Sequence, residues 1–134
     1  MKKLLLTALA VGVTNMAFFA LGGPLYYNAA VEAQKSSFPD AVKGYPEASF
    51  ALVMIVALSV LFALALEHFR ADSLRKGIQY GASIMGGLFL VMNMQMLGMY
   101  NLIDLNFAIT DTIISAVMGG IMGAVAVSVM RRMA

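Results

Sequence analysis

The chain has 134 residues, of which 61% are hydrophobic and only 12% are charged, and its formal net charge is +2. Soluble domains carry about 25% charged residues, so these charges are too few to cover a water-soluble fold, and the charge is too mild for a nucleic-acid surface. The absence of cysteine excludes disulfides, iron–sulfur clusters and thiol catalysis, and the single histidine, His68, leaves no imidazole pair to bind a metal. We therefore expect a lipid bilayer as the main solvent, and no cofactor, metal site or nucleic-acid partner.

Four stretches of the sequence are apolar enough to cross a membrane, which takes roughly 20 residues of helix. They cover about residues 4–27, 50–66, 77–100 and 107–130. None shows sustained two-residue alternation, and every backbone amide in lipid needs an internal partner, so helices are expected. The pattern predicts an all-α protein with a single transmembrane domain, 1–134, folded as an integral membrane four-helix bundle.

The first stretch ends in the sequence GGPLYY. Proline removes an amide donor and crowds the preceding turn, so this motif predicts the end of the helix, with a kink as the alternative. Residues 28–49 contain Pro39, Pro46 and charges of both signs, which predicts a solvated outer loop with a short interfacial helix over 29–35.

The N-terminal sequence MKKLLLTALAVG also resembles a signal peptide, and cleavage near residues 20–23 would leave three spans. The apolar run continues to Tyr27, beyond the 7–15 residues usual for a signal core, so we expect the segment to remain as a span.

Positive charge is distributed unevenly between the two ends of the predicted spans. Lys35 and Lys43 fall on one side, and seven of the nine basic residues fall on the other: Lys2, Lys3, Arg70, Arg75, Lys76, Arg131 and Arg132. Such residues concentrate on the cytoplasmic side of membrane proteins. The bias predicts both termini inside the cell (N-in/C-in), in a multi-pass protein that we expect in a cell inner membrane.

Small residues at four-residue spacing occur in the third and fourth stretches, where they would let helix backbones approach closely. They are Gly77, Gly81 and Gly87, followed by Ser115, Gly119, Gly120 and Gly123. We expect them to pack the third and fourth spans into a close hairpin, with a homo-oligomer interface as the alternative.

Polar side chains inside apolar spans are costly unless satisfied, so they mark candidate sites. Five of them predict a pocket in the outer half of the bundle, rimmed by Tyr26 and Asp104: Asn15, Asn93, Gln95, Asn101 and Asp111. Asp111 is the only ionisable residue well inside a span. It fits either a carboxylate coupled to a proton or cation, or a structural group near a helix start.

Methionines alternate with amides in the segment MNMQM at residues 92–96. Met85, Met92, Met96 and Met99 fall on one helical stripe, and thioethers can bind Cu(I). Methionine is also a flexible filler of irregular gaps, and the chain has 12 of them. Packing is the interpretation we favour over copper transfer.

The layout resembles a family of small four-span bacterial inner-membrane proteins of unknown function. The similarity lies in the glycines at the start of the third span, in Tyr100-Asn101-Leu102, in Thr110-Asp111 and in the GGPLYY exit. That family places aspartate where this chain has Asn101. The resemblance implies a four-span fold and no particular activity.

Three functions fit the sequence. A non-catalytic accessory or structural membrane protein, working in a larger complex or as a homo-oligomer, is favoured because no nucleophile–base or phosphate-loop motif is present. A small oligomeric transporter or channel would use the polar pocket. A membrane enzyme would use Asp111, Asp104 and Tyr100, and we do not favour it because Asp104 lies in a predicted turn.

Overall fold

The protein is all helical in the computed structural model, which describes residues 1–43, 47–100 and 102–133. The helices are α1 (Lys2–Gly22), α2 (Asn28–Ser37), α3 (Ala48–His68), α4 (Leu74–Met99) and α5 (Leu105–Arg132), and a π-helical turn, η1 (Gly23–Tyr27), joins α1 to α2. Within the described ranges, four continuous helices are long and apolar enough to cross a membrane: Lys2–Ser37, α3, α4 and α5. The predicted all-helical class is confirmed, and so are four helices long and apolar enough to cross a membrane.

The chain does not leave the helix at Pro24, so the predicted helix end is wrong. The Gly23 amide still donates to the Phe19 carbonyl, and the Asn28 amide donates to the Gly23 carbonyl five residues earlier. The wider π turn accommodates the proline ring and its missing donor without breaking the helix. Helix α2 therefore occupies the first ten residues of the segment predicted as the outer loop.

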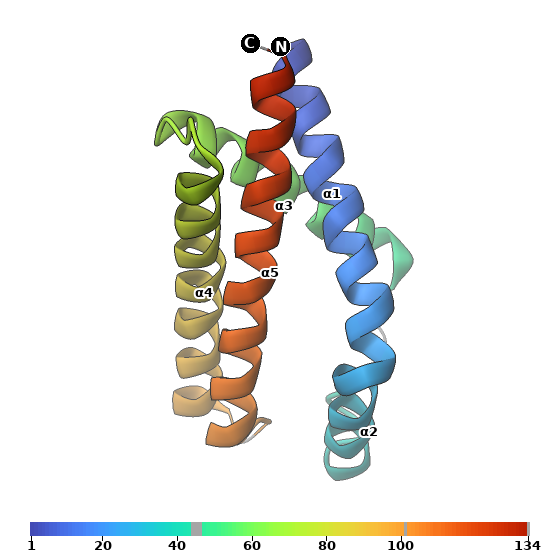
Figure 1. The fold of residues 1–134 in the computed structure, drawn as a ribbon. Helices are drawn as coiled ribbons and strands as arrows, with labels where there is room; N and C mark the ends of the chain where they lie inside the picture. Colours follow the sequence, from blue (N-terminus) through green and yellow to red (C-terminus); the bar gives the residue numbers. More distant parts are fainter. Residues whose placement is uncertain (44–46, 101, 134) are drawn as a thin grey trace.

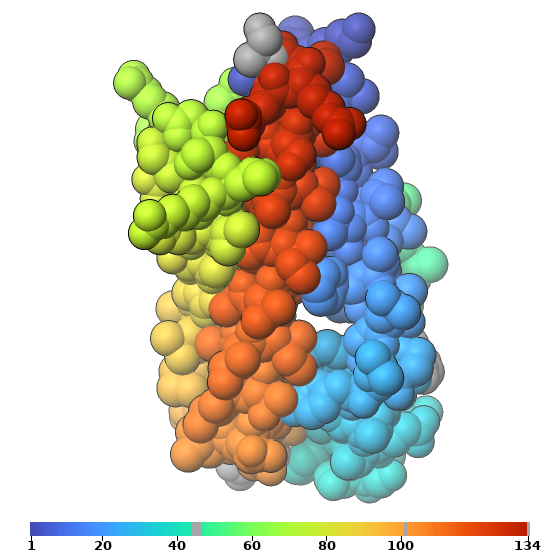
Figure 2. Space-filling model, viewed as in Figure 1, coloured from blue at the N-terminus to red at the C-terminus, as the bar shows by residue number. Residues whose placement is uncertain are grey.

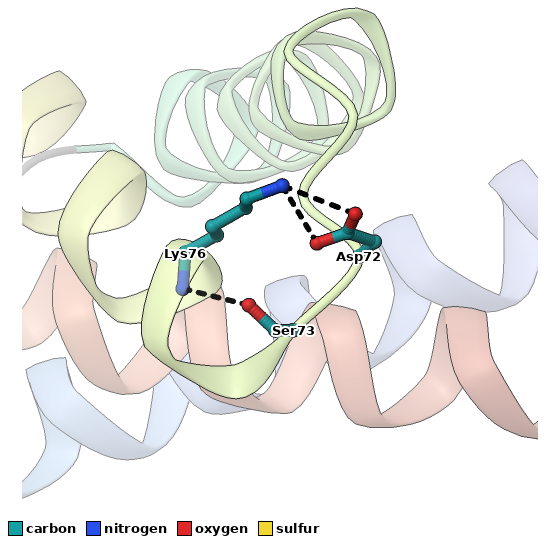
Figure 3. A network of polar contacts seen from close by, with 3 residues as sticks. All are labelled: Asp72, Ser73 and Lys76. Carbon is teal, nitrogen blue, oxygen red and sulfur yellow. Dashed lines mark hydrogen bonds and ion pairs between the residues drawn. The ribbon is translucent and has the colours of Figure 1, made fainter.

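Two polar side chains cap the starts of α4 and α5. The Ser73 hydroxyl accepts a hydrogen bond from the Lys76 amide at 3.3 Å, and Asp104 accepts one from the Phe107 amide at 2.7 Å. Figure 3 shows the Ser73 cap together with the ion pair of Lys76 and Asp72, whose nearest nitrogen–oxygen distance is 2.9 Å. The hydrogen bond from Lys76 lowers the pKa of Asp72 below its ordinary value.

Helix α3 ends in a Schellman motif, in which amides beyond the helix bond back to its last carbonyls. The Ala71 amide donates to the Leu66 carbonyl at 3.0 Å, and the Arg70 amide donates to the Glu67 carbonyl at 3.1 Å. Arg70 has a φ of 51°, in the left-handed region where glycine is usual. The motif turns the chain sharply from α3 into α4.

Helix α5 lies at the centre of the molecule. It packs along α4 on one side and α1 on the other, and α3 packs mainly against α1, behind the other helices in Figure 1. Both termini and the α3–α4 link lie at one end, and α2 lies at the other. The apolar core joins α1, α3, α4 and α5, and its fully buried residues include Val11, Phe62, Leu66, Met85, Met122 and Val127.

The contact between α4 and α5 is made backbone to backbone at glycines. A Cβ at Gly77 would lie 2.6 Å from the Gly123 carbonyl oxygen, and a Cβ at Gly81 would overlap the carbonyl of Gly119. The structure thus places four of the predicted packing glycines at one close approach. Gly87 has open space around its Cβ position and lies outside this approach.

Two other predicted packing residues lie beside the glycine approach. A Cβ at Gly120 would lie 3.4 Å from the Ile78 side chain, which is ordinary contact. Ser115 is buried, with 2% of its surface exposed.

Candidate functional site: a buried carboxylate between three helical segments

Asp111 accepts a hydrogen bond on each carboxylate oxygen, from two different parts of the chain. The Tyr27 hydroxyl donates to Oδ1 at 2.6 Å, and the Asn93 amide nitrogen donates to Oδ2 at 2.8 Å. Asp111 is only 5% exposed and Asn93 only 6%. We call these three side chains the Tyr27–Asp111–Asn93 network; it links η1, α5 and α4.

Aromatic packing positions Tyr27 at the carboxylate. The Tyr26 ring stacks on Phe107 of α5, with centroids 6.0 Å apart and planes at 17°, and meets the Tyr27 ring edge to face at 5.2 Å. Because Tyr26 and Tyr27 are the last two residues of the π turn, its wider geometry sets the direction in which the Tyr27 side chain points. The proline motif and the aromatic pair therefore act together in bringing this hydroxyl to α5.

Asn93 reaches Asp111 because α4 and α5 form an antiparallel hairpin. The same Asn93 nitrogen lies 3.2 Å from the Thr112 hydroxyl and 3.3 Å from the Ala108 carbonyl, so it faces the first turns of α5. The Thr112 hydroxyl donates in turn to the Ala108 carbonyl at 2.7 Å. The amide is thus held by α5 backbone and side-chain acceptors as well as by the carboxylate.

A small cavity of about 80 Å³ opens beside Asp111, between α1, η1, α4 and α5. Tyr27, Asp111 and Ser115 provide its polar lining, and Phe18, Phe19 and Phe89 are among its apolar residues. Figure 2 shows the molecule hollowed between α5 and the end of α1. The cavity has room for a few water molecules, and its polar groups could hold them.

The structure brings two of the five predicted pocket residues, Asn93 and Asp111, into direct contact. Gln95 lies on an exposed face of α4, where its nitrogen is 3.8 Å from the Met99 sulfur. Asn101 lies outside the described residues. Asn15 is 1% exposed, and neither its oxygen nor its nitrogen has a partner among the described residues.

The structure separates the methionines of the predicted stripe. Met85 is fully buried and packs where a Cβ on Gly119 would stand. Met92 and Met99 of the stripe are 50% and 66% exposed, and Met94, which lies off the stripe, is 43% exposed. Packing inside the chain thus accounts for Met85, whereas these three point outward. Among the described residues, no three His, Cys, Asp or Glu side chains gather closely enough to hold a metal ion.

Tyr27 is the residue of the site that the sequence analysis did not identify, because the GGPLYY motif was considered only as a helix end or a kink. The sequence feature that could have identified Tyr27 is a tyrosine at the end of the first apolar stretch, at about the same predicted depth as Asp111. Tyr26, predicted at the rim, supports the site through ring stacking, and Asp104 caps α5 instead of facing the carboxylate.

The contacts of Asp111 are those of a residue that holds helices together, more than those of an open reactive centre. Each carboxylate oxygen has a short donor, and the ion pairs of the described residues, Lys43–Glu47 and Lys76–Asp72, do not involve Asp111. Comparison with models of known protein families, with curated proteins and with solved structures finds no match to this chain. The resemblance to a four-span bacterial family therefore stays a prediction.

Proposed function

We propose that this chain is an integral membrane protein with four spans and both termini in the cytoplasm, acting as a non-catalytic accessory or structural subunit of a bacterial inner membrane. The observation that carries the proposal is the Tyr27–Asp111–Asn93 network. A carboxylate buried among apolar helices, with both oxygens engaged by neutral donors from neighbouring segments, acts as a tie between helices.

The arrangement of charges supports the orientation. Both termini and the α3–α4 link lie at the same end of the helices in Figure 1, so the basic residues at these three places gather there. Lys35 lies in α2, at the other end, and Lys43 follows α2 in the sequence. In a bilayer, the two ends of the helices would therefore differ in positive charge, which is the difference that sets the orientation of membrane proteins.

Orientation is testable with single cysteines, because the natural chain contains none. Ser36→Cys in α2 and Arg75→Cys at the start of α4 place one exposed thiol at each end. In right-side-out vesicles, a membrane-impermeant maleimide should label the first and not the second, and inverted vesicles should reverse the result. Labelling of both thiols on one side, or release of the protein by alkaline carbonate, would refute the four-span topology.

The accessory role is testable by purification in a mild detergent. We expect the tagged chain to migrate with defined partner subunits at a mass well above its own 14.3 kDa plus the detergent micelle. Cross-linking in intact membranes before solubilisation should capture the same subunits. A chain that runs as a monomer after both treatments would contradict the role.

The cavity beside Asp111 favours a small oligomeric transporter or channel as the second candidate. In that function the carboxylate would exchange a proton or cation with the water that the cavity can hold. Liposome flux assays of the parent chain, Asp111→Asn and the exposed control Asp40→Asn test it. Flux lost only in Asp111→Asn would favour transport; a parent chain that moves no protons or monovalent cations would eliminate it.

A further inference from the structure

A second cavity, of about 350 Å³, lies at the end of the molecule where the termini and the α3–α4 link meet. Its charged lining comes from three separate parts of the chain: Lys3 at the start of α1, Arg131 at the end of α5, and Glu67, Arg70 and Asp72 around the end of α3. Segments far apart in the sequence thus direct charged residues to one recess.

The balance of charge in this recess is positive. Asp72 is already paired with Lys76, as Figure 3 shows, so its charge is compensated from outside the lining. Three cations, Lys3, Arg70 and Arg131, then face the single acid Glu67. Two of the three cations are arginines, whose planar guanidinium groups match phosphate oxygens in pairs.

Arg70 stands at a backbone position that disfavours it. Its φ of 51° belongs to the residue after a helix end where glycine is usual, and a larger side chain there is strained. Strained residues persist where the surrounding structure holds them and cluster at ligand sites. Arginine at this strained position supplies a guanidinium group to the recess, which a glycine would not do.

The floor of the recess is apolar and buried. Leu66, Ala71 and Met130 line it, and each is at most 6% exposed. A volume of this size lies within the range of small-ligand sites. A ligand with a phosphate at one end and hydrocarbon next to it fits a cationic rim over an apolar floor better than a free phosphate ion does.

We propose that this recess binds the phosphate of an anionic phospholipid headgroup. The proposal rests on the membrane insertion proposed above, which would place the recess at the cytoplasmic surface of the bilayer. Basic pockets between helices at that level recognise anionic headgroups, and each cation near the surface strengthens binding about fivefold. Lys3, Arg70 and Arg131 are the binding residues.

Native mass spectrometry of the full chain in neutral detergent tests the proposal, with phosphatidylglycerol or phosphatidylcholine added in increasing amounts. We expect the protein to bind phosphatidylglycerol more tightly than phosphatidylcholine. The Arg131→Gln substitution should weaken phosphatidylglycerol binding about fivefold. The matched control is Arg132→Gln, which removes the neighbouring charge outside the lining and should have little effect. Arg70→Gly should weaken phosphatidylglycerol binding by a similar factor without lowering the melting temperature of the protein, because glycine readily adopts the positive φ of residue 70.

Equal affinity for the two lipids, or equal effects of Arg131→Gln and Arg132→Gln, would overturn the headgroup site. Full displacement of the lipid by inorganic phosphate at the same concentration would also overturn it, in favour of a free-phosphate site. Carbonate extraction and thiol labelling separate the two proposals. If the protein is inserted in the membrane but does not prefer phosphatidylglycerol, only the headgroup site is refuted. If carbonate extracts the protein, both the headgroup site and the four-span topology are refuted.

Discussion

Replacing Gly81 by alanine tests the close approach of α4 and α5 directly. The added methyl group would meet the Gly119 carbonyl oxygen and lie about 3.1 Å from the Gly123 Cα atom. These atoms belong to the backbone, so no side-chain rotation can make room. The two helices must separate or shift along each other. Gly87 provides a matched control on the same helix, because its Cβ position meets nothing within 4 Å.

The expected magnitudes follow from two opposing effects. Alanine is favoured over glycine inside a helix by up to about 1 kcal/mol, and both variants gain this. Overpacking typically costs about 1–3 kcal/mol, and only Gly81→Ala pays it. We therefore expect Gly87→Ala to be neutral or slightly stabilised, and Gly81→Ala to be about 1–3 kcal/mol less stable than Gly87→Ala.

The comparison can be made by heating detergent-solubilised protein and measuring the fraction that still elutes as a single species. Since about 1 kcal/mol shifts the melting temperature by roughly 2–8 °C in chains of this order of size, the two variants should differ by several degrees. Equal melting temperatures for Gly81→Ala and Gly87→Ala would refute the backbone-to-backbone contact.

Three further predictions concern polar contacts. Tyr27→Phe leaves Asp111 Oδ1 without its 2.6 Å donor and should cost about 0.6–3 kcal/mol in the same heating assay, and an unchanged melting temperature would contradict the network. Ser73→Ala removes the cap of α4 and should cost about 1 kcal/mol, seen as faster amide exchange confined to the first turn. Lys76→Met should raise the lowered pKa of Asp72 toward its ordinary value in an NMR titration. The ion pair should stabilise the start of α4 above the unfolded-state pKa of Asp72 and lose this effect as pH falls through the folded-state value; a pKa unchanged by Lys76→Met would contradict this.

The helices were predictable because apolar composition and length decide them. The hairpin was predictable too, because the segment between the third and fourth spans is too short to let them separate. The course of the chain through Pro24 was not, because a proline inside a span fits both a helix end and a π turn. The outcome depends on whether later amides find carbonyls to bond, and the Asn28 amide finds that of Gly23.

The candidate site was predictable only in part. Asn93 and Asp111 share a depth, so their contact follows once α4 and α5 lie antiparallel. Gln95 could not join them, because residues two apart on a helix point about 200° away from each other. Tyr27 depended on the rotation introduced by η1, which the sequence pattern does not reveal. Tertiary geometry thus decided which polar residues met.

The Gly81→Ala and Tyr27→Phe substitutions perturb two separate contacts on α5. Gly119 meets Gly81 of α4, and Asp111, eight residues or about 12 Å away along the helix, meets Tyr27 of η1. Because hydrophobic contrast contributes little between helices in lipid, these close contacts would carry much of the association. Sites this far apart usually act additively, within about 0.5 kcal/mol, when the substituted groups have no shared partner. Gly81 and Tyr27 have different partners on α5, although Asn93 also joins Asp111 to α4. The Gly81→Ala, Tyr27→Phe double variant should therefore lose the sum of the two single losses. A smaller loss would show that displacing α5 at one tie already breaks the other, and that α5 moves as one rigid body.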